Sequence, residues 1–274
     1  MHSGWWVSLE GAERELRDLA MHFDDPDFEI VEDAGTFYLS SMDFSEFDNS
    51  EQVRELAREL VAAASGSLAV KFGRFDPPRV GNVVLVDEAG AKQHHVIVSS
   101  AIRLHFEASA QIERVREDGS VDVVELVAPP PQTRAWARHA RSDSDTKDVL
   151  AILGREDVRW HDLYHVFEVV EADVGDMMFT KRWVTEAEVR RFKHTANSRM
   201  AIGRDARHGH QKYDRPKKPL AFPEARALVL TLVRTWLDMK VPPPPPRELV
   251  VEVRDPNSKS AAVGKGERDD KTAT

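Results

Sequence analysis

Apolar side chains recur over residues 1–65 with two different periods, which predict strands and helices in turn. Residues 5–9 alternate between apolar and polar side chains, as expected of a short strand with one buried face. An apolar side chain at every third or fourth position predicts helices over 10–23 and 50–65. Two further alternating segments, 28–31 and 36–39, predict a pair of strands joined by the turn sequence EDAG.

From residue 67 the apolar period becomes two, which predicts strands rather than helices. The glycine-containing sequences DEAGAK and REDGS separate some of these segments in the manner of β-hairpin turns. The predicted strands are 67–73, 81–87, 93–99, 101–108, 111–116 and 121–127. Residues 1–127 are therefore predicted to form an α+β domain with a mainly antiparallel sheet and two helices.

The pattern becomes helical after the prolines at 129–131, which mark a boundary in the chain. Thr185 and Glu188 form a capping box, which is typical of a helix start. No period is visible over 197–220, and this segment is predicted to be a long loop. The helices predicted in this part are 148–153, 157–170, 185–196 and 223–240.

These patterns divide the chain into four parts. Residues 1–127 are the α+β domain, for which we expect a sensing or partner-binding role, and 128–147 form a linker. Residues 148–240 are predicted to be a helical bundle domain. Residues 241–274 contain a five-proline spacer, a short strand-like segment and a polar tail that we expect to be disordered.

Composition excludes several classes of protein and site. The sequence has no cysteine, which excludes disulfides, thiolate zinc sites and cysteine nucleophiles. The N-terminus lacks the basic and apolar regions of a signal peptide, and no window is apolar over the length of a membrane span. We therefore expect a cytoplasmic protein with no membrane partner.

Charge is distributed unevenly along the chain. The formal net charge is -9, and the segment 1–60 holds sixteen Asp and Glu against four Lys and Arg. Residues 190–210, RRFKHTANSRMAIGRDARHGH, combine six Lys and Arg with three His, and we call this segment the basic block. A basic, histidine-bearing block in an acidic protein indicates a candidate site for a phosphate-rich partner.

Arginine and histidine together suffice for metal-independent cleavage of RNA. Arginine binds phosphate oxygens with a planar fork and stays charged, whereas histidine exchanges a proton near neutral pH. One group activates the 2′-hydroxyl or protonates the leaving oxygen, while the cation stabilises the charged transition state. This chemistry requires no metal and no cofactor, and we expect neither.

A short motif inside the basic block carries a family resemblance. Arg204 and Asp205 are an arginine and a polar residue, and His210 follows Arg204 after five intervening residues, whereas the His208–Gly209 pair follows after three. With the long apolar helix predicted after it, this motif resembles that of the HEPN families of helical nucleic-acid-acting domains. The order of a sheet-rich domain and then a helical one is similar to ApeA-type abortive-infection proteins.

The resemblance implies a helical bundle that forms a homodimer, with Arg204 and either His208 or His210 from both subunits lining one RNA-cutting cleft. It further implies a bacterial defence or stress response as the setting. Asp205 would orient the arginine or the helix end. The remaining residues that we expect to contact RNA phosphates are Lys193, His194, Arg199 and Arg207.

Other interpretations stay open. The first is a non-catalytic protein–protein interaction module or accessory subunit, in which the acidic N-terminal domain docks a protein partner and the basic block is structural. A zinc site is the second, because His161, His165 and Glu168 share one face of the helix predicted over 157–170. That face lies opposite the apolar stripe, so a solvated polar surface explains it without a metal.

Overall fold

The computed structural model divides the chain into two compact units, residues 1–106 with 130–243 and residues 107–129 with 244–274. The structure describes residues 4–25, 27–86, 131–207 and 214–243, and the backbone of strands 92–93, 109–115, 121–127 and 247–254. Strands come first and helices dominate the later part of the first unit, so the fold class is α+β, as predicted.

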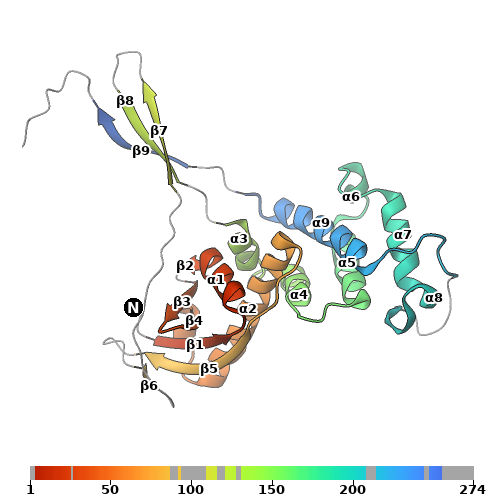
Figure 1. The fold of residues 1–274 in the computed structure, drawn as a ribbon, viewed down its shortest axis with the longest axis horizontal. Helices are drawn as coiled ribbons and strands as arrows, with labels where there is room; N and C mark the ends of the chain where they lie inside the picture. Colours follow the sequence, from red (N-terminus) through yellow and green to blue (C-terminus); the bar gives the residue numbers. More distant parts are fainter. Residues whose placement is uncertain are drawn as a thin grey trace, which may run out of the picture. The chain divides into compact units, whose positions relative to one another are not determined.

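The first unit begins with an antiparallel sheet of strand order β2-β3-β4-β1-β5-β6 (Figure 1). Its strands are β1 (Gly4–Glu10), β2 (Asp24–Asp25), β3 (Phe28–Asp33), β4 (Thr36–Ser40), β5 (Arg79–Val86) and β6 (Lys92–Gln93). The period of two buries Val7 and Leu9, and Val7 pairs with Leu39 on one side and Val83 on the other. The predicted strands at 5–9, 28–31, 36–39 and 81–87 are therefore confirmed.

A two-residue turn joins β3 to β4. Ala34 and Gly35 both have positive φ, 55° and 77°, between the paired residues Asp33 and Thr36. Two successive positive φ angles define the turn whose twist matches that of antiparallel strands. Glycine adopts a positive φ without strain, and the EDAG sequence places a glycine at the second of these two turn positions.

One long helix, α2 (Ser50–Phe72), corrects a prediction. The segment 67–73 was expected to be a strand, but the helix continues through it and ends at Gly73, which has φ 83°. Every residue from Ala63 to Val70 is buried, so no polar face marks the helical period. A short segment buried on all sides has the same apolar pattern in a helix as in a strand, which explains the error.

Helix α2 separates two hydrophobic cores. On one side it covers the sheet together with α1 (Glu13–His22) and the 3-10 helix η1 (Met42–Glu46), and Leu60 and Leu68 pack there. On the other side it packs against α3 (Gln132–His139) and α4 (Ser144–Leu153) (Figure 1). Ala63 and Val70 belong to that second core, which contains Trp136 and Trp236.

The second core is built by helices from residue 132 onward. They are α3, α4, α5 (Trp160–Val174), α6 (Met177–Thr180), α7 (Glu186–Asn197), α8 (Arg199–Ile202), the 3-10 turn η2 (Gly203–Asp205) and α9 (Phe222–Lys240). The helices predicted at 148–153, 157–170, 185–196 and 223–240 are confirmed, although α4 begins earlier and α5 later than expected. The loop predicted over 197–220 is partly wrong, because its first residues form α8 and η2.

The second unit is described by the backbone of three strands. These are β7 (Ser109–Val115), β8 (Val121–Val127) and β9 (Arg247–Arg254), which form an antiparallel sheet of order β7-β8-β9. The strands expected at 111–116 and 121–127 and in the strand-like segment after the prolines are confirmed. Residues 94–108, which hold two other expected strand segments, lie outside the described residues, as does the tail from residue 255.

Asp143 connects the start of α4 to the end of α9. Its carboxylate accepts hydrogen bonds from the Thr146 backbone N–H at 2.7 Å and from Lys240 Nζ at 2.9 Å. Burial alone would raise its pKa, but the hydrogen bonds from Lys240 and Thr146 lower the pKa of Asp143 to about 2. The charged carboxylate therefore stabilises the fold above pH 4, and this contribution is lost as the pH falls toward 2.

We expect Asp143→Ala to lower the free energy of unfolding by about 2 kcal/mol at pH 7, since it removes both a helix cap and an ion pair. Asp143→Asn keeps an oxygen for Thr146 and should cost about half as much. Urea denaturation of both variants measures the difference. Equal losses in the two variants would show that the charge on Asp143 contributes nothing.

Candidate functional site

The basic block begins on α7 and then folds back on the end of that helix. The backbone N–H of Arg207 donates to the carbonyl of Ala196 at 3.1 Å. On the far side of the loop, the Leu220 N–H donates to Thr195 Oγ1 at 3.1 Å. Both segments that flank residues 208–213 are thus attached to the last turn of α7, and residues 208–213 themselves lie outside the described part.

Arg207 lies against the exposed side of α5. One of its guanidinium nitrogens is 3.0 Å from Glu168 Oε1, and its Cζ is 4.8 Å from the centre of the Tyr164 ring. Such a cation stacked on an aromatic ring and paired with a carboxylate has a fixed orientation. Arg207 therefore anchors the basic block to α5.

A groove lies beside this anchor, and we call it the α5 groove. Its polar lining consists of Arg155, His161, Asp162, Tyr164, His165, Glu168 and Arg207. Arg155 Nη1 and His161 Nε2 both approach Asp162 Oδ1, at 3.2 and 3.4 Å. The groove thus combines two guanidinium groups with two imidazoles. The sequence had been interpreted as placing His161 and His165 on a plain solvated surface and Arg207 at RNA phosphates.

The residues expected to contact RNA phosphates differ in their surroundings. Lys193 Nζ is held by both oxygens of Glu171, at 2.6 and 2.7 Å, and His194 Nε2 donates to the carbonyl of Asp214 at 2.9 Å. Arg199 is exposed. The structure therefore brings Arg207 to the α5 groove but joins Lys193 to a carboxylate of its own chain.

Arg204 and Asp205 lie in the exposed turn η2, which begins at Gly203 with its φ of 65°. Within the described part of the chain neither side chain forms an ion pair. Arg204 is thus accessible, whereas its expected partners His208 and His210 lie outside the described residues. Their pairing with Arg204 and the orienting role of Asp205 remain predictions.

Neither a metal site nor a membrane span occurs in the described residues. No group of three His, Asp or Glu side chains is arranged to hold a metal ion there, the set His161, His165 and Glu168 included. Nor is any helix in the described ranges long and apolar enough to cross a membrane.

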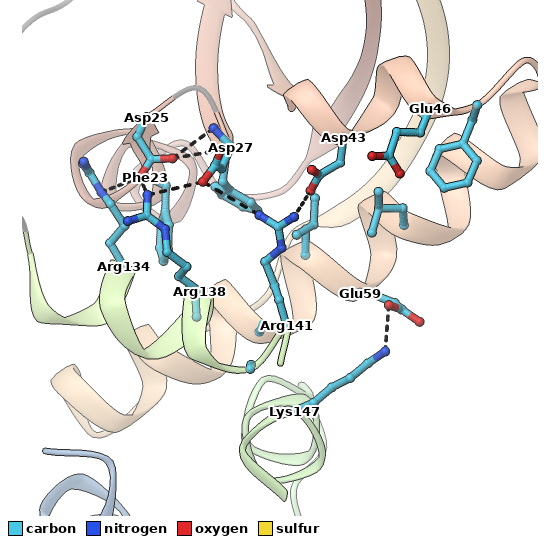
Figure 2. Close-up of a pocket in the computed structure, with 17 residues that line it drawn as sticks. Phe23, Asp25, Asp27, Asp43, Glu46, Glu59, Arg134, Arg138, Arg141 and Lys147 are labelled. Atoms are coloured by element: carbon cyan, nitrogen blue, oxygen red, sulfur yellow. Dashed lines mark hydrogen bonds and ion pairs between the residues drawn. The ribbon is translucent and has the colours of Figure 1, made fainter. Parts of the chain in front are cut away.

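Sequence reasoning missed a cavity of about 330 Å³ in the first unit (Figure 2). We call it the charged cavity, because four cations of α3 and α4 and their flanks line it opposite five carboxylates from the segment 25–59. Arg134, Arg138 and Arg141 are spaced i, i+4 and i+7, so they share one helical face. That spacing, together with the acidic excess of the segment 1–60, is the only signal of the cavity that the sequence contains.

Ion pairs connect the two walls of the charged cavity. Arg138 Nη2 is 2.8 Å from Asp25 Oδ2, and Lys147 Nζ is 2.8 Å from Glu59 Oε2. Between these pairs, Arg141 donates to Asp43 (Figure 2). The floor is apolar and is lined by Phe23, Phe28, Phe47, Leu56, Leu60 and Ala63.

Comparisons with known proteins found no match for this chain among family models, curated proteins or solved structures.

Proposed function

We propose that the protein binds RNA through the basic block and the α5 groove and cleaves it without a metal, as a HEPN-like endoribonuclease of a bacterial defence or stress response. The exposure of Arg204 carries this proposal. An arginine already buried against a carboxylate could not bind a phosphate, whereas Arg204 is exposed and has no ion pair within the described residues.

The α5 groove supports the proposal with a second set of suitable groups. Arg207 lies three positions after Arg204 and is fixed beside His161 and His165. A phosphodiester bound between Arg204 and the groove would therefore have imidazoles on the groove side. The helical bundle around α5, α7 and α9 provides the rigid support that such a site needs.

The reaction follows from these groups. A histidine base accepts the proton of the ribose 2′-hydroxyl, and the 2′-oxygen forms a bond to phosphorus. The bond from phosphorus to the 5′-oxygen breaks, and a second proton donor protonates that oxygen. The products are a 2′,3′-cyclic phosphate and a free 5′-hydroxyl, while Arg204 stabilises the extra negative charge that forms on the phosphoryl oxygens. We assign the proton transfers to His208 or His210.

We expect the purified protein to cleave a pool of total RNA in the presence of a chelator, and Arg204→Ala to lower the rate at least about a hundredfold. The double variant His208→Ala/His210→Ala should lose activity to a similar degree. Arg58→Ala is the matched control, since this exposed α2 side chain pairs with Glu55 and lies outside the basic block and the α5 groove. Gel analysis of the fragments and of their cyclic phosphate ends measures the reaction.

Absence of cleavage by the wild-type protein, or equal cleavage by all variants, would refute the nuclease assignment. Fluorescence polarisation with a labelled single-stranded RNA separates binding from cleavage. Binding that Arg204→Ala weakens, without cleavage by any form, would indicate an RNA-binding domain that has no catalytic activity.

A second candidate is a non-catalytic interaction module that docks a protein partner. The observation in its favour is that Lys193 and Arg207, two of the expected phosphate ligands, already pair with Glu171 and Glu168. In this case the basic block attaches the loop to α5, and RNA is not the partner. The polarisation experiment decides between the two candidates, because the interaction module predicts no RNA affinity that depends on Arg204.

A further inference from the structure

The charged cavity has the construction of a small-molecule site. Its volume of about 330 Å³ falls within the range of ligand-binding pockets, and its floor combines aromatic and aliphatic side chains. Phe23, Phe28 and Leu60 in that floor are at most 8% exposed, so they form part of the sheet-side core. The floor is therefore rigid, and an apolar ligand group would cover it without first opening the core.

The charges around the cavity do not balance. Each of the four cations in the lining faces a carboxylate. Arg134 meets Asp25 and also Asp24, which lies outside the lining, while Arg138 meets Asp25, Arg141 meets Asp43 and Lys147 meets Glu59. The fourth carboxylate, Asp27, is shared at longer range by Arg138 and Arg141, at 3.5 and 3.9 Å. The fifth, Glu46, forms no ion pair or hydrogen bond within the described residues, so the lining has one unmatched negative charge.

Hydrogen bonds on both sides of Glu46 hold the backbone of η1 in place. Ser41 caps this 3-10 helix by accepting from the Asp43 N–H at 3.3 Å. Trp5 Nε1 donates to the carbonyl of Phe47 at 3.0 Å, which joins the residue after Glu46 to strand β1. The backbone that carries Glu46 and Phe47 is thus held in place, and both residues line the cavity.

We infer that the charged cavity binds a small amphipathic organic cation, with its apolar body on the floor and its ammonium or guanidinium group against Glu46. A monocation supplies the positive charge that Glu46 lacks, and its apolar part replaces water over the phenylalanines. An anion of the same shape finds each arginine and lysine already opposed by a carboxylate and is repelled by Glu46. This site does not depend on the proposed action on RNA.

The probes that test the inference share one ring and one chain length. Phenethylammonium carries a cation, phenylacetate an anion and 2-phenylethanol no charge. In isothermal titration calorimetry at pH 7 and low salt, we expect phenethylammonium to bind with a Kd on the order of 1 mM or tighter. The neutral probe should bind at least about tenfold more weakly, and the anion should not bind.

Variants locate the site. Glu46→Gln should weaken phenethylammonium binding about tenfold and abolish the preference over 2-phenylethanol. The matched control is Glu55→Gln, an exposed α2 glutamate that pairs with Arg58 outside the cavity and should leave the Kd unchanged. Ala137→Leu adds methyl groups to a residue of the lining and should weaken all probes that bind.

Three results would overturn the inference. They are absence of phenethylammonium binding to the wild-type protein, equal affinity for phenylacetate, and an unchanged Kd in both Glu46→Gln and Ala137→Leu. Because Glu46 is exposed, its replacement leaves the fold intact, and a circular dichroism spectrum checks this.

Discussion

Replacing Gly66 with alanine should lower the free energy of unfolding by about 3 kcal/mol, although alanine is by far the better helix former. The reason is the contact between α2 and α4. A Cβ at residue 66 would lie 2.0 Å from the carbonyl oxygen of Leu150 and 2.6 Å from its carbon. These are backbone atoms of the neighbouring helix, which cannot turn aside as the end of a side chain would.

The contact is reciprocal, and this enlarges the expected effect. A Cβ on Gly154, which follows α4, would lie 2.5 Å from the carbonyl oxygen of Ala62 and 2.9 Å from the nitrogen of Gly66. To admit either methyl group, α2 and α4 must separate. The packing of Leu150 and Leu153, both fully buried, would then be lost.

Urea denaturation of Gly66→Ala measures this loss, with Gly73→Ala as the control. Gly73 has a positive φ of 83° but no atom within 4 Å of an added Cβ, so its replacement should cost only about 1 kcal/mol of conformational strain. A Gly66→Ala variant as stable as the wild type would mean that α2 and α4 do not approach as closely as described.

Gly66 also shows why part of the fold could not be predicted from the sequence. The strands and helices with one solvated face were predicted correctly, because alternating polar residues reveal the period. Over 63–70 the helix is buried from both sides, and its small residues allow close packing rather than marking a turn. The packing partner of Gly66 is Leu150 on α4, which is so distant along the chain that it leaves no local trace.

The candidate sites, too, could be predicted from the sequence only in part. Arg204 and Arg207 could be selected from sequence because charge and residue type are local properties. Their surroundings could not, since Glu168 and Tyr164 come from another helix. The charged cavity needs residues from 23 to 147. The acidic excess of one wall and the helical spacing of the other are visible in the sequence. The sequence does not show that these two walls face each other across a cavity.

The second large effect that we expect is on the pH dependence of stability, and it comes from a buried histidine. His22, at the end of α1, is 6% exposed and lies between α2 and α3. Lys71 Nζ is 3.2 Å from its Nε2, and Thr133 Oγ1 is 2.7 Å from its Nδ1. Since the lysine ammonium can only donate, Nε2 is the acceptor and Nδ1 carries the proton that is donated to Thr133.

Protonation of His22 is unfavourable in the folded state. Burial, the charge of Lys71 and the charge of Arg134, in this order, lower the pKa of His22 to about 4. The unfolded chain has an ordinary histidine pKa near 6.5. Below about pH 6.5 the unfolded chain binds the proton before the folded protein does. The stabilisation that the neutral ring gives the folded state is therefore present at pH 7 and is lost as the pH falls toward 4.

We therefore expect His22 to account for a loss of about 2 kcal/mol in the free energy of unfolding between pH 7 and pH 5. His22→Gln keeps one donor and one acceptor but cannot titrate. Between pH 7 and pH 5 the variant should therefore lose about 2 kcal/mol less stability than the wild type. Urea denaturation at both pH values gives the comparison. If wild type and His22→Gln lose the same stability, protonation of His22 is no less favourable in the folded protein than in the unfolded chain, and the lowered pKa of the buried ring is refuted.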